Sequence, residues 1–347
     1  MRILILSIIL IVFIISFVQA EVPLSAEFKL YSAYVDNLFQ TSTPYSDYVT
    51  LLSLDTSLNL NESSSIQYVF DINRFKEYSD LHNQTHFLGI NYGKSVFDGQ
   101  GILQLGSFTG LHDNTSEYAY YDYRSVGVRS NLKYYFSETL FLLTEYQAEY
   151  ENHHNFDDYS SLENYGFIQI NKSFNTRTTV QTKLETGRRD HTNLDSNATL
   201  ITGSIKIAQS LADLTGLQLQ YIWHNAYGNS SYLLNNYYLL EDQDDEYSYS
   251  GNKWQLTLKH YAPWNIMLKG TLSRDQRSYN ISFTNGQKRN DVNINVLLEL
   301  EKRISFSNPL LQNISFYMQF LHKNTRSNDP NFQSATNILS IGSGISF

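Results

Sequence analysis

The sequence predicts an all-β fold, a transmembrane antiparallel β-barrel of about sixteen strands with short turns at one end and longer loops at the other. Three observations carry this prediction. Apolar and polar residues alternate with a period of two along most of the 347 residues, the alternating segments are long enough to cross a bilayer, and their connections alternate between short and long. A mean hydropathy of −0.35 agrees with a barrel, because only every second strand residue faces lipid.

The first twenty residues differ from the rest of the chain. Arg2 is their only charged residue, Ile3 to Val18 is almost wholly apolar, and small or short residues precede a cleavage position after Ala20. We interpret residues 1–20 as a secretory signal peptide and residues 21–347 as a single barrel domain. A membrane anchor is the alternative, although the apolar run is shorter than the roughly 20 residues of a spanning helix.

Composition excludes several classes of function. The chain has no cysteine, which excludes a disulfide scaffold, a thiolate metal site and a cysteine nucleophile. Its 25 basic and 34 acidic residues give a formal net charge of −9. Nucleic-acid binding driven by contacts to the phosphate backbone is therefore not expected.

Sixteen segments alternate, and most exceed the five or six residues of an ordinary strand and reach the roughly 9 to 11 of a membrane-spanning one. In one of them Leu52 and Leu54 alternate with Ser53 and Asp55. The segments are 26–36, 46–60, 64–75, 84–95, 101–112, 119–136, 140–151, 162–174, 177–189, 198–208, 215–226, 248–260, 265–277, 290–304, 313–324 and 334–347. All five prolines fall outside their interiors, as expected because proline cannot donate a ladder hydrogen bond.

The connections form two classes in alternation. The short ones include 137–139, 175–177 and 261–264, and the longer polar ones include 151–161, 190–197, 227–247 and 278–289. We expect the short turns on the periplasmic side and the long loops outside. The two longest loops, 227–247 and 278–289, are candidates for a segment folded into the pore. For 278–289 the alternative is that its strands extend above the membrane.

The turn at 137–139 predicts the register in which the strands on either side of it pair. A three-residue hairpin there places Phe136 opposite Leu140, Tyr134 opposite Leu142, and Glu145 opposite Asn131. Apolar residues then meet apolar residues on one face and charges gather on the other.

The C-terminus carries the most specific pattern. The chain ends in an aromatic residue that follows apolar residues at alternate positions: Leu339, Ile341, Ile345 and Phe347. This pattern resembles the recognition signal that outer-membrane barrels present to their assembly machinery, with Ser343 as the one departure. The alternative is an edge strand that happens to end in phenylalanine.

The mature chain as a whole resembles the integral outer-membrane β-barrels, with a strand number similar to that of the general porins; no characterised subfamily is identified. The resemblance implies an outer membrane of the Gram-negative type. It also implies outer-membrane lipid, the barrel-assembly machinery and periplasmic chaperones as partners. The oligomeric state stays open.

Aromatic residues near the strand ends predict girdles at the two membrane interfaces, where a ring sits among the headgroups. They are Tyr134, Phe136, Trp223, Trp254, Tyr261 and Trp264. A second aromatic group lies in a long loop and could stack on carbohydrate as readily as belong to a girdle: Tyr232, Tyr237, Tyr238, Tyr247 and Tyr249.

Two further groups are candidates for chemistry, and for each we favour a solvated loop. His153 and His154 lie near Asp157 and Asp158, but adjacent histidines point poorly at one ion, so we expect no metal site and no cofactor. The acidic run 241–246 could hold Ca²⁺ or Mg²⁺, yet it lacks the spacing of an EF-hand. No G-x-S-x-G motif occurs, and we expect no enzyme.

The expected function is passive diffusion of small polar solutes through an aqueous pore. Charges predicted to line the lumen are Arg129, Lys133, Glu145, Glu149, Lys183, Glu185, Lys206, Lys259, Lys269, Glu299, Glu301 and Arg303. With the other polar-face charges, the wall comes to about +1, while the long loops are acidic. An acidic mouth predicts a weak preference for cations. The alternative is a non-transporting surface barrel or polysaccharide-export accessory barrel whose loops bind a partner.

Overall fold

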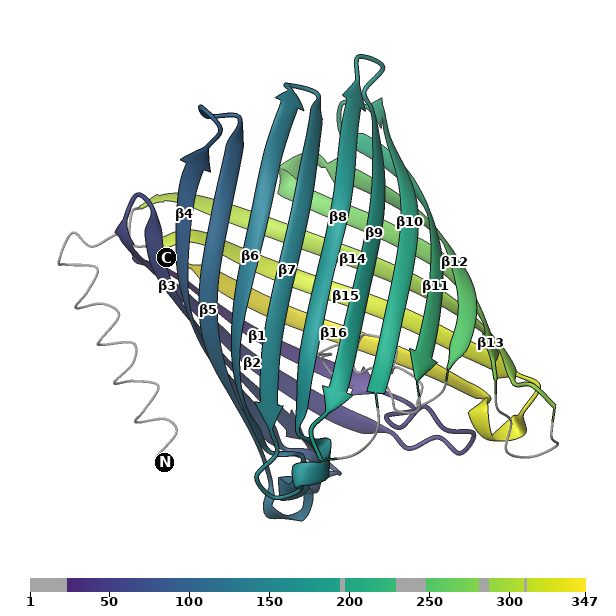
Figure 1. The fold of residues 1–347 in the computed structure, drawn as a ribbon. Helices are drawn as coiled ribbons and strands as arrows, with labels where there is room; N and C mark the ends of the chain where they lie inside the picture. Colours follow the sequence, from purple (N-terminus) through teal and green to yellow (C-terminus); the bar gives the residue numbers. More distant parts are fainter. Residues whose placement is uncertain (1–23, 194–196, 229–247, 281–286, 309–310) are drawn as a thin grey trace.

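The computed structural model describes residues 24–193, 197–228, 248–280, 287–308 and 311–347. Within them, sixteen antiparallel strands form one closed barrel in which each strand pairs with its neighbours in the chain and β1 pairs with β16 (Figure 1). The strands are β1 (Leu24–Val35), β2 (Asp47–Asn61), β3 (Ser64–Phe75), β4 (Asn83–Val96), β5 (Gly101–Asn114), β6 (Tyr123–Ser137), β7 (Leu140–Asn152), β8 (Ser161–Phe174), β9 (Thr178–His191), β10 (Asn197–Ala212), β11 (Thr215–Gly228), β12 (Tyr249–Ala262), β13 (Ile266–Tyr279), β14 (Asn290–Asn308), β15 (Leu311–Ser327) and β16 (Ser334–Ser346).

The predicted fold class is confirmed, and each predicted segment overlaps one strand. The segment predicted at 119–136 begins late, at Tyr123, because Ser116–Tyr121 forms a 3₁₀ helix, η2. The Asp122 carboxylate closes this loop by accepting hydrogen bonds from the backbone and side-chain nitrogens of Asn114, at 2.6 and 3.1 Å.

The two classes of connection are also confirmed. At one end, here called the turn end, the described connections between strands have two to four residues. At the other, the loop end, the described connections before β2, β4, β6, β8 and β16 have six to eleven.

The predicted hairpin register holds except at its tip. Tyr134 pairs with Leu142 and Asn131 with Glu145, as expected. Leu140 pairs with Ser137 instead of Phe136, because a bulge between Tyr135 and Ser137 adds one residue to β6.

Side chains on the two faces of the wall differ in chemistry. One face exposes aliphatic residues throughout, including Ile90, Val126, Ile168, Leu298 and Ile341. The other carries most of the charged residues, together with Val35 and Val49, which are only 1% exposed. A face turned to the surroundings could not bury such residues, so the second face is the interior and the aliphatic face is the one that meets lipid.

A small apolar core closes the barrel at the loop end where the first and last strands meet. It contains Ala33, Val35, Val49, Phe75 and Ile338. Beside it lies the buried Asp47 carboxylate, which accepts hydrogen bonds of 2.6 to 3.2 Å from the backbone N–H groups of Tyr48, Lys76, Glu77 and Tyr78. Apolar contact and one buried carboxylate therefore hold the loop between β3 and β4 against the wall.

The predicted signal peptide lies outside the described residues. So do most of the loop 227–247, with its acidic run and the tyrosines Tyr232, Tyr237, Tyr238 and Tyr247, and residues 281–286 of the other long loop. Within the described ranges, no helix is long and apolar enough to cross a membrane.

Candidate functional site: the inner wall of the barrel

The register assigns each charged strand residue to one face. All twelve of the charges predicted to line the lumen lie on the inner face, on β6, β7, β9, β10, β12, β13 and β14. In the strands as described, this face carries twelve basic and thirteen acidic side chains, a net charge of −1.

The predicted wall charge of about +1 is therefore wrong in sign. It omitted residues in β1 or near strand ends, where the alternation of apolar and polar residues is too weak to assign a face. The register places six more charges inside: Glu27, Lys29, Asp47, Glu163, Arg277 and Asp291.

Toward the turn end, opposite charges of the inner wall form local pairs. Lys269 Nζ lies 2.5 Å from Glu299 Oε2 across β13 and β14. Along single strands, Arg303 pairs with Glu301 at 2.9 Å, and Lys183 pairs with Glu185. Each pair cancels its own field within a few ångströms, so this part of the wall is polar without a dominant sign.

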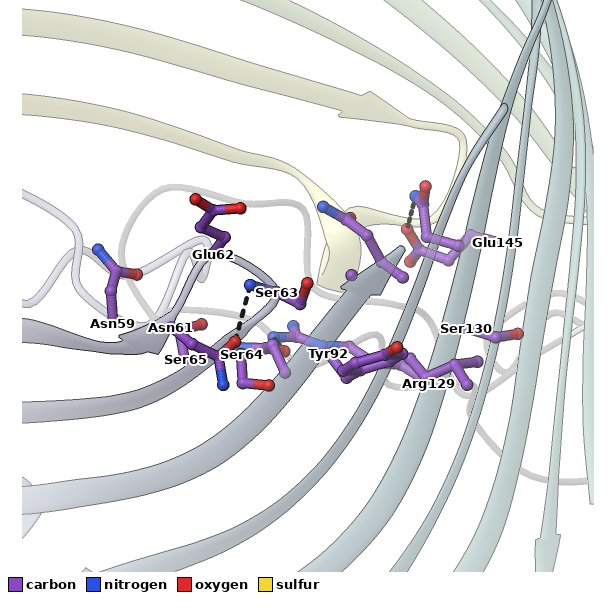
Figure 2. Close-up of a pocket in the computed structure, with 15 residues that line it drawn as sticks. Asn59, Asn61, Glu62, Ser63, Ser64, Ser65, Tyr92, Arg129, Ser130 and Glu145 are labelled. Carbon is purple, nitrogen blue, oxygen red and sulfur yellow. Dashed lines mark hydrogen bonds between the residues drawn. The ribbon is translucent and has the colours of Figure 1, made fainter. Parts of the chain in front are cut away.

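A recess of about 460 Å³ opens in the inner wall at the turn end (Figure 2). The figure shows residues of the β2–β3 turn, including Asn61 and Ser63, on one side and Arg129, Ser130 and Glu145 on the other. Ser63 O accepts a hydrogen bond from Gly93 N at 2.6 Å, which holds the turn against β4. The recess is lined mainly by residues with amide, hydroxyl or charged side chains: Asn59, Asn61, Glu62, Ser63, Ser64, Ser65, Asn91, Tyr92, Gly93, Gln104, Leu105, Arg129, Ser130, Asn131 and Glu145.

A glycine between two long side chains shapes the floor of this recess. Arg129 on β6 reaches over β5 and donates to Asn91 Oδ1 on β4 at 2.7 Å. A Cβ atom at Gly106, on the strand between them, would lie 2.9 Å from Asn91 Oδ1 and 3.1 Å from the Arg129 side chain. A side chain at this position would push both groups aside, so Gly106 leaves the space in which the Arg129 guanidinium lies against Asn91.

At the loop end the inner wall holds buried charges in a row across three strands. Glu149 on β7 pairs with Glu163 on β8, which pairs with Arg189 on β9. Arg189 donates from Nε and Nη2 to Glu163 Oε2 at 3.2 and 2.7 Å. Glu151, two residues along β7, is buried as deeply as Glu149. One guanidinium therefore lies among three carboxylates.

A second buried group lies on the opposite part of the loop end. Asp275 accepts from Arg277 Nε at 2.9 Å and lies 3.0 Å from His224 Nε2. Nearby, the Arg289 guanidinium lies between the rings of Tyr279 and Phe332, at 3.9 and 3.6 Å from their centres. The inner wall is thus closely packed at the loop end and open at the turn end.

His153 does not lie in solvated loop as predicted. It is only 9% exposed, and its ring lies between those of Tyr123 and Tyr159, at 5.3 and 5.9 Å. The described residues contain no cluster of three or more metal-ligating side chains. Loss of hydration, reinforced by the Arg189 charge, lowers the pKa of His153 to about 4.

This burial predicts a pH dependence of stability. Because the unfolded chain protonates His153 near its usual pKa of about 6.5 and the folded barrel does not until about pH 4, acid favours the unfolded chain in that interval. We expect unfolding in urea to become easier as the pH falls from 7 to 4, and the His153→Gln variant to show less of this change. An equal pH dependence in both proteins would contradict the assignment to His153.

Five of the six predicted girdle aromatics lie on the lipid-facing side or at a rim. Tyr134, Trp223 and Trp254 belong to the outward register, and Trp264 in the turn η4 (Pro263–Asn265) is 80% exposed. Tyr261 was placed wrongly, because β12 continues to Ala262 and keeps its alternation. Its ring therefore lies on the inner face, 4.8 Å from Lys259 Nζ.

The predicted C-terminal signal lies at the closing seam. Leu339 and Ile341 are exposed on the outer face, and Ile345 shares their register. The Phe347 backbone donates to Ala26 O at 2.9 Å, joining the last residue to β1.

Comparison with known proteins supports the fold and does not name a family. No family model and no curated protein match the sequence. The structure is similar to the porin OccAB3 of Acinetobacter baumannii, with a TM-score of 0.58 and 11% sequence identity over 94% of this chain and 99% of that one. It is also similar to the porin OpdK of Pseudomonas aeruginosa, solved with vanillate, with a TM-score of 0.53 and 10% identity over 94% of this chain and 99% of that one. A bacterial polysaccharide outer membrane secretin matches at TM-score 0.53 and 10% identity over 93% and 97% of the two chains.

At these identities the likeness concerns the fold alone. The chain forms a closed sixteen-stranded antiparallel barrel whose structural neighbours include these porins, which points to a multi-pass β-barrel of the outer membrane.

Proposed function

We propose that the chain forms an aqueous pore through which small polar solutes diffuse passively across the outer membrane. The observation that carries this proposal is the inner wall, a closed surface of charged and amide side chains inside a sixteen-stranded barrel. Barrels of about this strand number are too wide for their side chains to fill the lumen. Such a function requires no catalytic residue, metal or cofactor.

Selectivity in this proposal comes from small differences of charge. The wall carries −1 and several of its turn-end charges are paired, so it discriminates little. The buried carboxylates Glu149 and Glu151 and the partly buried Glu163 outnumber the one guanidinium of Arg189 near the loop end, which favours cations there. Salt screens such a field over about 10 Å at 0.1 M.

We expect channels in a planar bilayer to prefer K⁺ over Cl⁻ by about twofold at low salt, and the preference to fade as salt rises. The measurement is the reversal potential in a KCl gradient, repeated at high salt. A preference for Cl⁻ at low salt would contradict the charge argument while leaving the pore in place.

A second candidate is a barrel that does not transport but presents its loops to a partner or to exported polysaccharide. The close packing of the loop end favours it, because buried side chains such as Tyr279 and Asp291 leave little free space there. The similarity to the polysaccharide secretin concerns the fold only and adds no weight. A complete lack of conductance in the bilayer would favour this candidate over the pore.

We also propose that the C-terminal strand presents the signal read by the barrel-assembly machinery. Deleting Phe347 should then cut the yield of folded barrel several-fold while export to the periplasm continues. The yield is measured as the fraction that migrates faster on a gel before boiling. Ile345→Ala, which keeps the terminal aromatic, is the control and should reduce the yield less; a normal yield without Phe347 would remove the proposed role.

A further inference from the structure

The outer face of the barrel is positively charged, although the whole chain has a net charge of −9. In the described strands only Asp113 and Asp190 are acidic and face outward. Eight outward-facing residues are basic: Arg74, Lys94, Arg124, Lys172, Arg188, Arg274, Lys302 and Arg326. The face that meets lipid therefore carries +6 against −1 on the inner wall.

These eight cations are divided by residue type between the two ends. All five arginines lie in the halves of their strands nearer the loop end, and all three lysines lie nearer the turn end. Arginine differs from lysine in presenting a planar fork of donors that matches two oxygens of one phosphate or carboxylate. The loop end thus has the side chain suited to a bidentate anion, and the turn end does not.

The outward arginines have few protein partners. Arg188 is neutralised by Asp190, which accepts from its Nε and Nη2. Among the residues that the structure describes, no carboxylate lies within 4.0 Å of the other four, Arg74, Arg124, Arg274 and Arg326, which we call the arginine collar. Two of the three lysines differ, because Lys172 donates to Thr139 Oγ1 and Lys302 to Trp264 O at the turns.

Aromatic neighbours place members of the collar at the depth of lipid headgroups. Arg274 on β13 pairs directly with the outward Trp254 on β12. Arg74 pairs with Thr50, two residues from Tyr48, whose ring lies 5.1 Å from that of Tyr34. Exposed Trp and Tyr on a barrel mark the interface between the hydrocarbon and the headgroups.

We propose that the arginine collar binds the phosphate groups of a phosphorylated glycolipid in the outer leaflet. The four guanidinium groups are outward, lack protein anions in the described residues and lie in the strand halves nearer the loop end, and the aromatic neighbours of Arg74 and Arg274 put these two at headgroup depth. A lipid phosphate is the anion available at that depth, and arginine binds it through two parallel hydrogen bonds. The four collar residues lie on β3, β6, β13 and β15, which are not adjacent in the barrel.

The test compares two variants of the purified barrel that remove cations from opposite ends. One changes the collar (R74Q, R124Q, R274Q and R326Q), and the control changes the outward lysines (K94Q, K172Q and K302Q). Each is mixed in detergent with bisphosphorylated lipid A, and bound lipid is counted by native mass spectrometry. The collar variant should bind about tenfold less lipid A than the native barrel, because it loses charge-assisted hydrogen bonds, and the lysine variant should bind nearly as much.

Two further arms separate phosphate recognition from other lipid contacts. Lipid A without its phosphates should bind the native barrel as weakly as intact lipid A binds the collar variant. Phosphatidylglycerol, a phosphodiester, should bind the native barrel more weakly than bisphosphorylated lipid A. Equal binding of lipid A by both variants, or strong binding of the dephosphorylated lipid, would overturn the proposal. If the collar variant does not fold, single substitutions are compared, and R188Q, whose native guanidinium already has Asp190, should have the smallest effect.

Discussion

Replacing Arg189 with methionine should destabilise the barrel by about 3 to 5 kcal/mol, the cost of removing one partner from a buried ion pair. The guanidinium side chain is 6% exposed and bonds to Glu163 through two nitrogens. Without it, Glu149 and Glu163 would face each other across β7 and β8 with no cation in their row. Equilibrium unfolding by urea in lipid vesicles, followed by tryptophan fluorescence, measures the loss.

Arg303→Met is a matched control, because Arg303 also pairs with a glutamate on the inner wall, at 2.9 Å. Its side chain is 56% exposed, so the loss there should be at most about 1 kcal/mol. Adding Glu163→Gln to Arg189→Met should restore part of the lost stability, since one buried charge is removed. Similar losses for Arg189→Met and Arg303→Met would show that burial of the Glu149–Glu163–Arg189 row does not add to the cost of removing its cation.

The second large effect is expected on the lipid face. Leu52 lies on β2 facing outward, between Leu30 on β1 and Ile72 on β3. An arginine there should cost about 2 to 4 kcal/mol, as for a cation near the middle of a bilayer. The neighbouring Ser53 faces inward between Lys29 and Asp71, and Ser53→Arg should cost clearly less.

Both variants are measured by the same unfolding assay, and their difference tests the assignment of faces independently of total stability. Leu142→Arg against Leu143→Arg on β7 repeats the comparison on another part of the wall, five strands away. Equal or reversed costs in both pairs would show that the two faces of the wall have been exchanged.

Much of the fold could be predicted because alternation acts locally. A two-residue period assigns each side chain to a face, and one turn fixes the register of a hairpin, as for Tyr134 opposite Leu142. The same rule assigned twelve charged residues to the lumen, and in the structure all twelve lie on the inner face. Local errors arose where the period is interrupted, as at the bulge beside Phe136, or where a strand outlasts its expected end, as at Tyr261.

The packing of side chains from different strands could not be predicted from the sequence pattern. His153 is buried by Tyr123 and Tyr159, which belong to β6 and to the 3₁₀ helix η3 (Asp157–Tyr159). Arg129 reaches Asn91 only because Gly106 lies between them on a third strand. Such contacts depend on which side chains of neighbouring strands and loops come together, and alternation within one segment carries no information about these neighbours.

The seam between β1 and β16 has a consequence for how the chain folds. Asn337 donates to the Asp36 carboxylate across a separation of 301 residues, and Phe347 bonds to Ala26 at the opposite end of the same seam. Fifteen of the sixteen strand pairs join neighbours in the chain and form from local contacts, but the last must wait until residue 347 has arrived. Until then both edge strands present unpaired backbone groups to any other open sheet. Folding therefore ends in one slow, long-range step. Before this step is complete, the nascent barrel is most prone to aggregate and most dependent on chaperones.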